Sequence, residues 1–204
     1  MKQQLVNMLA LQNKMNSKVH PLWQEQQFEW YRAVWTECAE LMDHHGWKWW
    51  KKQNPDLAQI QLEIVDIWHF GMSILLQSGS TLEDVANLIE RQWTDTQDNV
   101  SFLDAVEQLA SDTLNQKSFS IPLFCQLMRL ADLDLASLYQ QYIGKNVLNF
   151  FRQDHGYKQG NYIKVWQGRE DNEHLADILG MLDPNAADFQ EAVYSALEHR
   201  YPDA

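Results

Sequence analysis

The chain has 204 residues and a net charge of −12, and no apolar run is long enough to span a membrane. The negative charge argues against a nucleic-acid polymer as main partner, because phosphate backbones bind basic surfaces. It does not exclude a small anionic ligand, since a metal ion and a local group of lysines and arginines can hold phosphates in an acidic protein.

Helical spacing of apolar residues dominates the chain. Leu5, Met8, Leu11 and Met15 mark a first helix. Proline, glycine and capping residues set the bounds of the others. We expect these further helices over residues 21–46, 54–79, from 80 onward, and over about 100–114, 122–132, 137–152 and 183–200.

Few strand signals occur, so the sequence predicts an all-α fold of the bundle type. We expect one catalytic domain over residues 1–204, with a rigid core over about 1–115 and a more mobile helical and loop cap over about 116–204. The stretch 154–162 is rich in glycine, tyrosine and polar residues, which predicts a functional loop.

The N-terminal segment is too polar for a secretory leader, which predicts a cytoplasmic protein. Cys38 and Cys125 lie in apolar helical contexts. We expect both to be reduced core residues rather than a disulfide.

Two acidic pairs have the spacing i, i+3, which places both carboxylates of a pair on one side of a helix. They are Glu37 with Glu40, and Glu63 with Asp66. If the two helices pack antiparallel, four carboxylates meet, and their mutual repulsion requires compensation. Mg²⁺ prefers such oxygen ligands, often shared with phosphates. The pattern therefore predicts metal-assisted phosphate chemistry.

A solvated or salt-bridged face is the alternative, because glutamates at this spacing are common on amphipathic helices. Glu37 and Glu40 lie off the apolar stripe of their helix, so their positions do not decide between a metal site and a solvated face. The helix that carries Glu63 and Asp66 is apolar around nearly its whole circumference. Such a helix is buried, and its charges then need partners.

The segment between the pairs reads Trp47-Lys48-Trp49-Trp50-Lys51-Lys52. Aromatic rings can stack on a base or sugar while ammonium groups meet phosphates, which favours a nucleotide ligand. The alternative is a tryptophan-rich corner that caps the bundle.

These motifs resemble the signature of the dimeric dUTPases, a branch of the all-α NTP pyrophosphohydrolase superfamily that includes MazG-type enzymes. The resemblance extends from Leu9 to about Leu175. It rests on Glu37-x-x-Glu40, residues 47–51, 63–70, 144–152 and 156–162, and Trp166-x-Gly168-Arg169-Glu170-Asp171-Asn172. It implies an all-helical homodimer that cleaves dUTP, and dUDP, to dUMP with more than one Mg²⁺ ion and closes on its nucleotide.

The resemblance also implies roles for the acidic residues. Glu37, Glu40, Glu63 and Asp66 would hold the metals. Glu40 would orient and deprotonate the attacking water, because a carboxylate within hydrogen-bond reach can complete that deprotonation. Asp66 would in addition contact the 3′-hydroxyl of the sugar.

Phosphate binding is implied for residues of the later motifs, namely Lys145, Asn149, Arg152, Tyr157 and Lys158. The first three share one helical face at i, i+4 and i+7, as a common ligand would require. An ordinary surface helix with a few basic residues is the alternative.

Base and sugar binding is expected from Gln12, Asn16, Trp47, Trp49, His69 and Phe70. The amides of Gln12 and Asn16 can present both a donor and an acceptor to uracil, although a plain polar helix face is the alternative. Phe70 would pack on the deoxyribose, and His69 would support the site or be a core histidine. Trp47 or Trp49 would close over the nucleotide.

Two other functions stay open at this point. A broader MazG-like hydrolase would cleave several nucleotides at equal rates. A helical interaction protein would bind a nucleotide without turnover and use the closed state to bias a protein contact.

Overall fold

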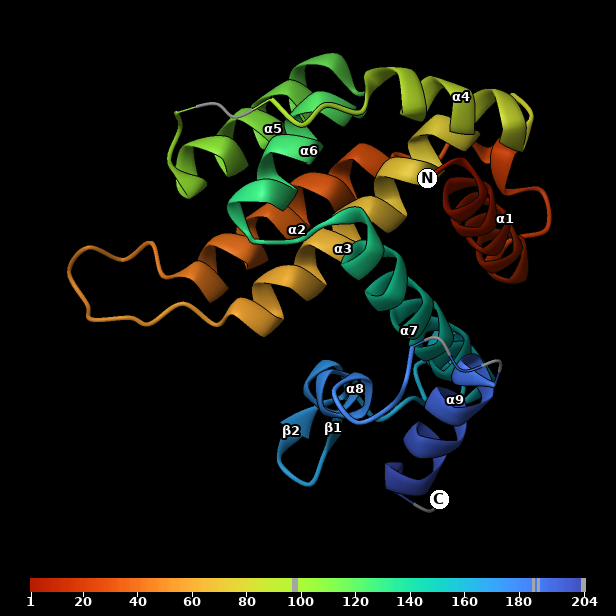
Figure 1. Cartoon of the computed structure of the whole chain (residues 1–204). Coiled ribbons are helices and arrows are strands. Elements are labelled where there is room, and N and C mark those ends of the chain that lie inside the picture. Colours follow the sequence, from red (N-terminus) through yellow and green to blue (C-terminus); the bar gives the residue numbers. More distant parts are fainter. Residues whose placement is uncertain (97–98, 185, 187, 203–204) are drawn as a thin grey trace.

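The computed structural model describes residues 1–96, 99–184, 186 and 188–202. These residues form nine α-helices, two short 3-10 helices and one hairpin of two-residue strands, which confirms the all-α fold (Figure 1). The α-helices are α1 (Lys2–Val19), α2 (Trp30–His45), α3 (Leu57–Leu76), α4 (Leu82–Gln92), α5 (Phe102–Gln116), α6 (Ile121–Leu130), α7 (Leu135–Asp154), α8 (Asp171–Leu179) and α9 (Phe189–Arg200). None of the described helices is both long and apolar enough to cross a bilayer.

Helices α2 and α3 pack antiparallel against each other, and α1, α4, α5 and α6 pack around them (Figure 1). Helix α7 leaves this group and carries α8 and α9 at its far end. The hairpin of β1 (Val165–Trp166) and β2 (Arg169–Glu170) lies beside α8. Helix α3 contacts both α7 and α8 where the two groups join, and α2 packs along α3. The predicted difference in mobility between residues 1–115 and 116–204 stays a prediction.

Side-chain caps fix several helix starts. Asp56 accepts a hydrogen bond from the backbone N–H of Gln59, so α3 begins at Leu57 rather than at Asn54-Pro55. Thr81 accepts one from the N–H of Asp84, so the cap of α4 starts one residue later than the sequence motif predicts. A free N–H at a helix start costs energy, and these oxygens remove that cost.

The second helix was predicted to start near Pro21, which is wrong. The chain first forms a 3-10 helix, η1 (Trp23–Gln26), and then turns at Gln27, whose φ of 53° is left-handed. That backbone angle cannot continue an α-helix, so α2 begins only at Trp30. The last helix likewise begins later than predicted, at Phe189.

Helix α8 was not predicted. The side chains of Glu170 and Glu173 form a reciprocal capping box at its start. The helix packs closely on α7 because Gly144 has no side chain there. A Cβ on Gly144 would lie 2.5 Å from the Leu179 Cδ2 atom. This close approach lies at the end of α8, whereas its start is held to α7 by the bonds from Arg152 to Asp171 and from Lys145 to Asn172.

Candidate active site

Three carboxylates converge between α2 and α3. One ligand oxygen each from Glu37, Glu63 and Asp66 lies within 4.8 Å of the others. Glu63 is only 3% exposed because α3 is buried on nearly all sides, as its apolar circumference predicts. Oxygen donors at this separation can share one hard divalent cation, so the residues fit Mg²⁺.

The electrostatics of the three carboxylates also favour a cation. Burial, and then the charges of Asp66 and Glu63, raise the pKa of Glu37 from 4.5 to about 9. Burial is the larger cause and the neighbouring carboxylates add to it, so a cation at this place would lower the cost of ionising Glu37. His44 offsets part of the negative charge, since its Nε2 lies 3.4 Å from Glu63 Oε1 and this contact raises the pKa of His44.

Glu40 lies at the edge of this group. Its side chain is exposed, and it does not belong to the set of three converging carboxylates. Burial, and then the charge of Glu63, raise its pKa, while Lys164 opposes the shift. Glu40 is therefore close enough to sense the cluster yet open to solvent. Its roles as a metal ligand and as a base stay predictions.

Without metal, the stability of the fold is expected to fall as pH rises from about 4.5 to about 9. The raised pKa of Glu37 means that the folded protein retains a proton that the unfolded chain releases. The unfolded state binds fewer protons in this window, so the free energy of unfolding declines with pH. Thermal unfolding in EDTA at several pH values would measure the slope. Glu37→Gln should flatten it, and an equal slope in that variant would contradict the assignment.

Lys145 faces the cluster from α7. Its Nζ lies 2.7 Å from Asp66 Oδ2 and donates to Asn172 Oδ1, also at 2.7 Å. The side chain is 1% exposed, so its charge is held in place by these two partners. The carboxylates can bind a metal ion, and the buried ammonium group lies beside them. Together the metal ion and the ammonium group can bind an anionic ligand.

Arg152 lies two turns further along α7. Its Nε and Nη2 donate to the two carboxylate oxygens of Asp171, at 2.8 and 2.9 Å. Its Nη1 donates to Asn149 Oδ1 at 3.2 Å. Burial alone would raise the pKa of Asp171, but the hydrogen bonds from Arg152 and Tyr162 lower it. The structure thus brings together the three α7 residues that the sequence assigned to phosphate.

The other two predicted phosphate residues lie further out. Tyr157 is half exposed, with its ring centroid 6.0 Å from the Arg152 guanidinium carbon. Lys158 is exposed and donates to the backbone oxygen of Val19 at 2.7 Å. Their phosphate roles stay predictions. Lys164 belongs to the local group of lysines and arginines that the sequence offers for phosphates, but it was given no role of its own. Its charge acts on Glu40, and Asp171 acts on it in turn.

Gln12 and Asn16 join a buried network between α1 and α3. Gln12 Nε2 donates to Asn16 Oδ1 at 2.9 Å, and both amides donate to Ser73 Oγ. His69 Nδ1 lies 2.6 Å from Gln12 Oε1, and burial lowers the pKa of His69 to about 3. His69 is thus neutral and part of this network, as the prediction of a supporting residue requires.

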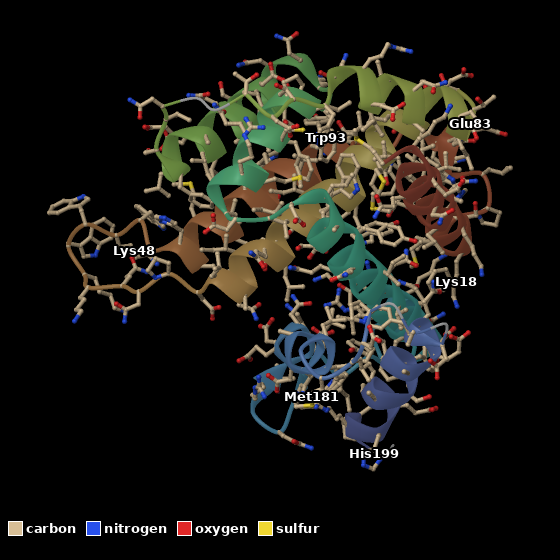
Figure 2. The ribbon with its side chains drawn as sticks, viewed as in Figure 1. Lys18, Lys48, Glu83, Trp93, Met181 and His199 are labelled. Carbon is tan, nitrogen blue, oxygen red and sulfur yellow. The ribbon has the colours of Figure 1, made fainter. Side chains whose placement is uncertain are left out.

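The aromatic residues divide into two groups. The ring of Phe70 stacks on Trp30 beside the core, with centroids 6.2 Å apart. Trp47 and Trp49 lie on the connection between α2 and α3, which projects from the body together with Lys48 (Figure 2). Trp49 is 90% exposed, which argues against a capping role in the bundle. Neither indole contacts the amide network, so closure over a nucleotide stays a prediction.

Sequence reasoning named Asp171 and Asn172 as part of a motif but gave them no role, and it missed the roles of His44 and Ser73. Asp171 is fully buried and Asn172 nearly so. The capping box ahead of Asp171 was the available signal, because it places the next two polar residues in a first helical turn. Ser73 lies four residues after His69, so helical periodicity could have placed it on the same face.

Fold and site together define a class. Within the described residues the protein is mainly helical and presents converging carboxylates on two antiparallel helices to buried cations on a third, an arrangement suited to metal-assisted binding of phosphates.

Comparison with known proteins gives the family. A family model described as dUTPase matches residues 4–157, which is most of the chain. The chain therefore belongs to this dUTPase family, whose reaction is the hydrolysis of dUTP. The comparison with curated proteins found no match.

Proposed function

We propose that the chain is a Mg²⁺-dependent dUTP diphosphatase that also accepts dUDP and releases dUMP. The observation that carries this proposal is the convergence of Glu37, Glu63 and Asp66 opposite Lys145. Family membership supports the nucleotide, and the hard oxygen donors support the metal.

Glu37, Glu63 and Asp66 would hold the metal, with Glu40 completing the set from its exposed edge. When bound, magnesium would neutralise charge on the phosphate oxygens and make a water easier to deprotonate. Glu40 would take the proton of that water, because it is the carboxylate of the group that solvent reaches.

The phosphate chain would lie along α7. Lys145 and Arg152 supply fixed positive charge, and Asn149 is oriented by its bond from Arg152. Such preorganised charge stabilises the transition state of phosphate cleavage without rearranging at the moment of reaction. Tyr157, Lys158 and Lys164 border this face and would complete the contacts as the protein closes.

The base and sugar would lie toward α1 and α3. Phe70 would pack on the deoxyribose, Asp66 would receive the 3′-hydroxyl, and the amide network would face uracil. Trp47 or Trp49 would cover the nucleotide from the projecting connection.

We further infer that the protein is a cytoplasmic homodimer. Large exposed indoles are costly on an isolated surface, and Trp50, which has no role in covering the nucleotide, therefore supports a subunit contact. Both cysteines are free and buried, which agrees with a reducing compartment. Light scattering on the purified protein would measure its mass, and a monomer at all concentrations would oppose the dimer.

Product analysis with dUTP, dUDP, dCTP, dTTP and UTP tests the reaction. We expect dUMP and pyrophosphate from dUTP with Mg²⁺, and no product after metal removal with EDTA. Intact dUTP under every metal condition would refute the proposal. Equal rates on several bases would favour the broader MazG-like hydrolase, and tight binding without turnover would favour the interaction protein.

A further inference from the structure

The amide network between α1 and α3 contains one hydroxyl with an unusual position. Ser73 is fully buried, and its hydroxyl donates to the backbone oxygen of His69, one turn earlier in α3, at 3.0 Å. Its only proton is used in that bond. The oxygen therefore presents nothing but lone pairs to the two amide groups that face it.

Those lone pairs fix the orientation of both amides. Gln12 Nε2 and Asn16 Nδ2 donate to Ser73 Oγ at 3.1 and 2.9 Å. If both amides were turned over, two carbonyl oxygens would compete with that of His69 for the single hydroxyl proton. Two buried acceptors would then lose their partners, which is costly in a dry interior.

The far side of Gln12 reinforces the same orientation. His69 is neutral and places Nδ1 at 2.6 Å from Gln12 Oε1. The Tyr142 hydroxyl lies 3.1 Å from the same oxygen and 3.0 Å from the backbone oxygen of Met8, so its one proton is shared between the two acceptors. Gln12 therefore uses both N–H groups within the protein, and its oxygen accepts from His69 and in part from Tyr142. Asn16 accepts one bond and donates one, which leaves one N–H and one lone pair of oxygen free for a ligand.

The orientation of Asn16 decides which pyrimidine it can bind. Uracil presents a donor at N3 beside a carbonyl acceptor, whereas cytosine presents an acceptor at N3 beside an amino donor. An amide held in one orientation matches one of these edges, and the same amide turned over matches the other. Free rotation would therefore abolish discrimination, although the shape of the pocket would be unchanged.

We propose that Ser73 is a positioning residue that makes the site prefer uracil to cytosine. Its oxygen lone pairs, together with Gln12, hold the amide of Asn16 in one orientation. This inference rests on the proposed function, since it assumes a uracil nucleotide at this network. Under this inference Asn16 forms the hydrogen bonds to the base. Gln12, His69 and Tyr142 help to hold the amide of Asn16 in its orientation.

The test compares kcat/KM for dUTP and dCTP in the full-length protein with Mg²⁺. In Ser73→Ala the ratio of dUTP to dCTP should fall by about tenfold or more, since one lost orientation constraint of this kind is worth that factor. KM for dUTP should rise, kcat should change less, and kcat/KM for dCTP should increase. A purely structural defect would lower kcat/KM for both substrates equally and leave the ratio unchanged.

Thr113→Val is the matched control. Thr113 is fully buried in α5 with its hydroxyl unpaired, so this variant removes a core hydroxyl away from the network. It should keep the wild-type ratio. A folded Ser73→Ala protein with the ratio of the control would overturn the inference.

Tyr142→Phe decides the matter if Ser73→Ala does not fold. It removes a hydroxyl whose one proton is shared between Gln12 Oε1 and the backbone oxygen of Met8, so it should reduce the ratio by a smaller factor. A wild-type ratio in this variant would also overturn the inference. Wild-type protein that cleaves both substrates equally would do the same, whereas wild-type protein that cleaves neither would instead refute the proposed function.

Discussion

Replacing Glu40 by glutamine is expected to lower kcat for dUTP by ~10²-fold or more, because general-base catalysis contributes at least that much. Glutamine has the same shape but cannot take a proton. Glu40 is exposed, so the substitution leaves no buried group unpaired and the fold should be retained. Steady-state kinetics gives kcat and KM, and circular dichroism reports the fold.

Asp43→Asn is the matched control for Glu40→Gln. Asp43 is the next exposed carboxylate along α2, and its partners among the described residues are the neighbouring Trp47 and Lys48. Its loss should change kcat by less than about twofold, as is usual for surface positions. If Glu40→Gln retained the kcat of this control, Glu40 could not be the base.

Replacing Asp171 by asparagine is expected to reduce the free energy of unfolding by about 3 kcal/mol. Asp171 is fully buried and accepts from two nitrogens of Arg152 and from Tyr162. Without the carboxylate, the Arg152 charge stays buried and uncompensated. Urea unfolding would measure this loss, and KM for dUTP should rise because Arg152 is no longer held.

Asp177→Asn supplies the comparison within the same helix. Asp177 also pairs with an arginine, with Arg169 Nη1 at 2.6 Å, but both side chains are largely exposed. Water screens this pair, so the midpoint in urea should barely move. If the two substitutions reduced the free energy of unfolding equally, burial of Arg152 would not explain the contribution of its ion pair to stability.

The parts of the fold that sequence could predict are those that periodicity encodes. The apolar circumference of α3 predicts a buried helix with buried charges, and Glu63 confirms it. The i, i+4, i+7 spacing of Lys145, Asn149 and Arg152 correctly places them on one face, where Lys145 and Arg152 share Asn172 of α8 and Asn149 accepts from Arg152.

Contacts between distant segments were beyond sequence reasoning. The bond from Arg152 to Asp171 depends on the turn at Gln167 and Gly168, both with positive φ, which returns the chain toward α7. The start of α2 depends on a left-handed residue, Gln27, that propensity does not mark. The exposure of Trp49 depends on where a loop points, and no pattern in its own residues sets that direction.

Lys145 and Arg152 are attached seven residues apart on α7, which is about 10.5 Å along the helix axis. Their charged groups nevertheless converge on one atom, because Lys145 Nζ lies 2.7 Å from Asn172 Oδ1 and Arg152 Nη2 lies 3.3 Å from the same oxygen. Two long side chains thus bring charges from separate turns of a helix to one point. Under the proposed function, a single phosphate group at this point would meet both charges at once.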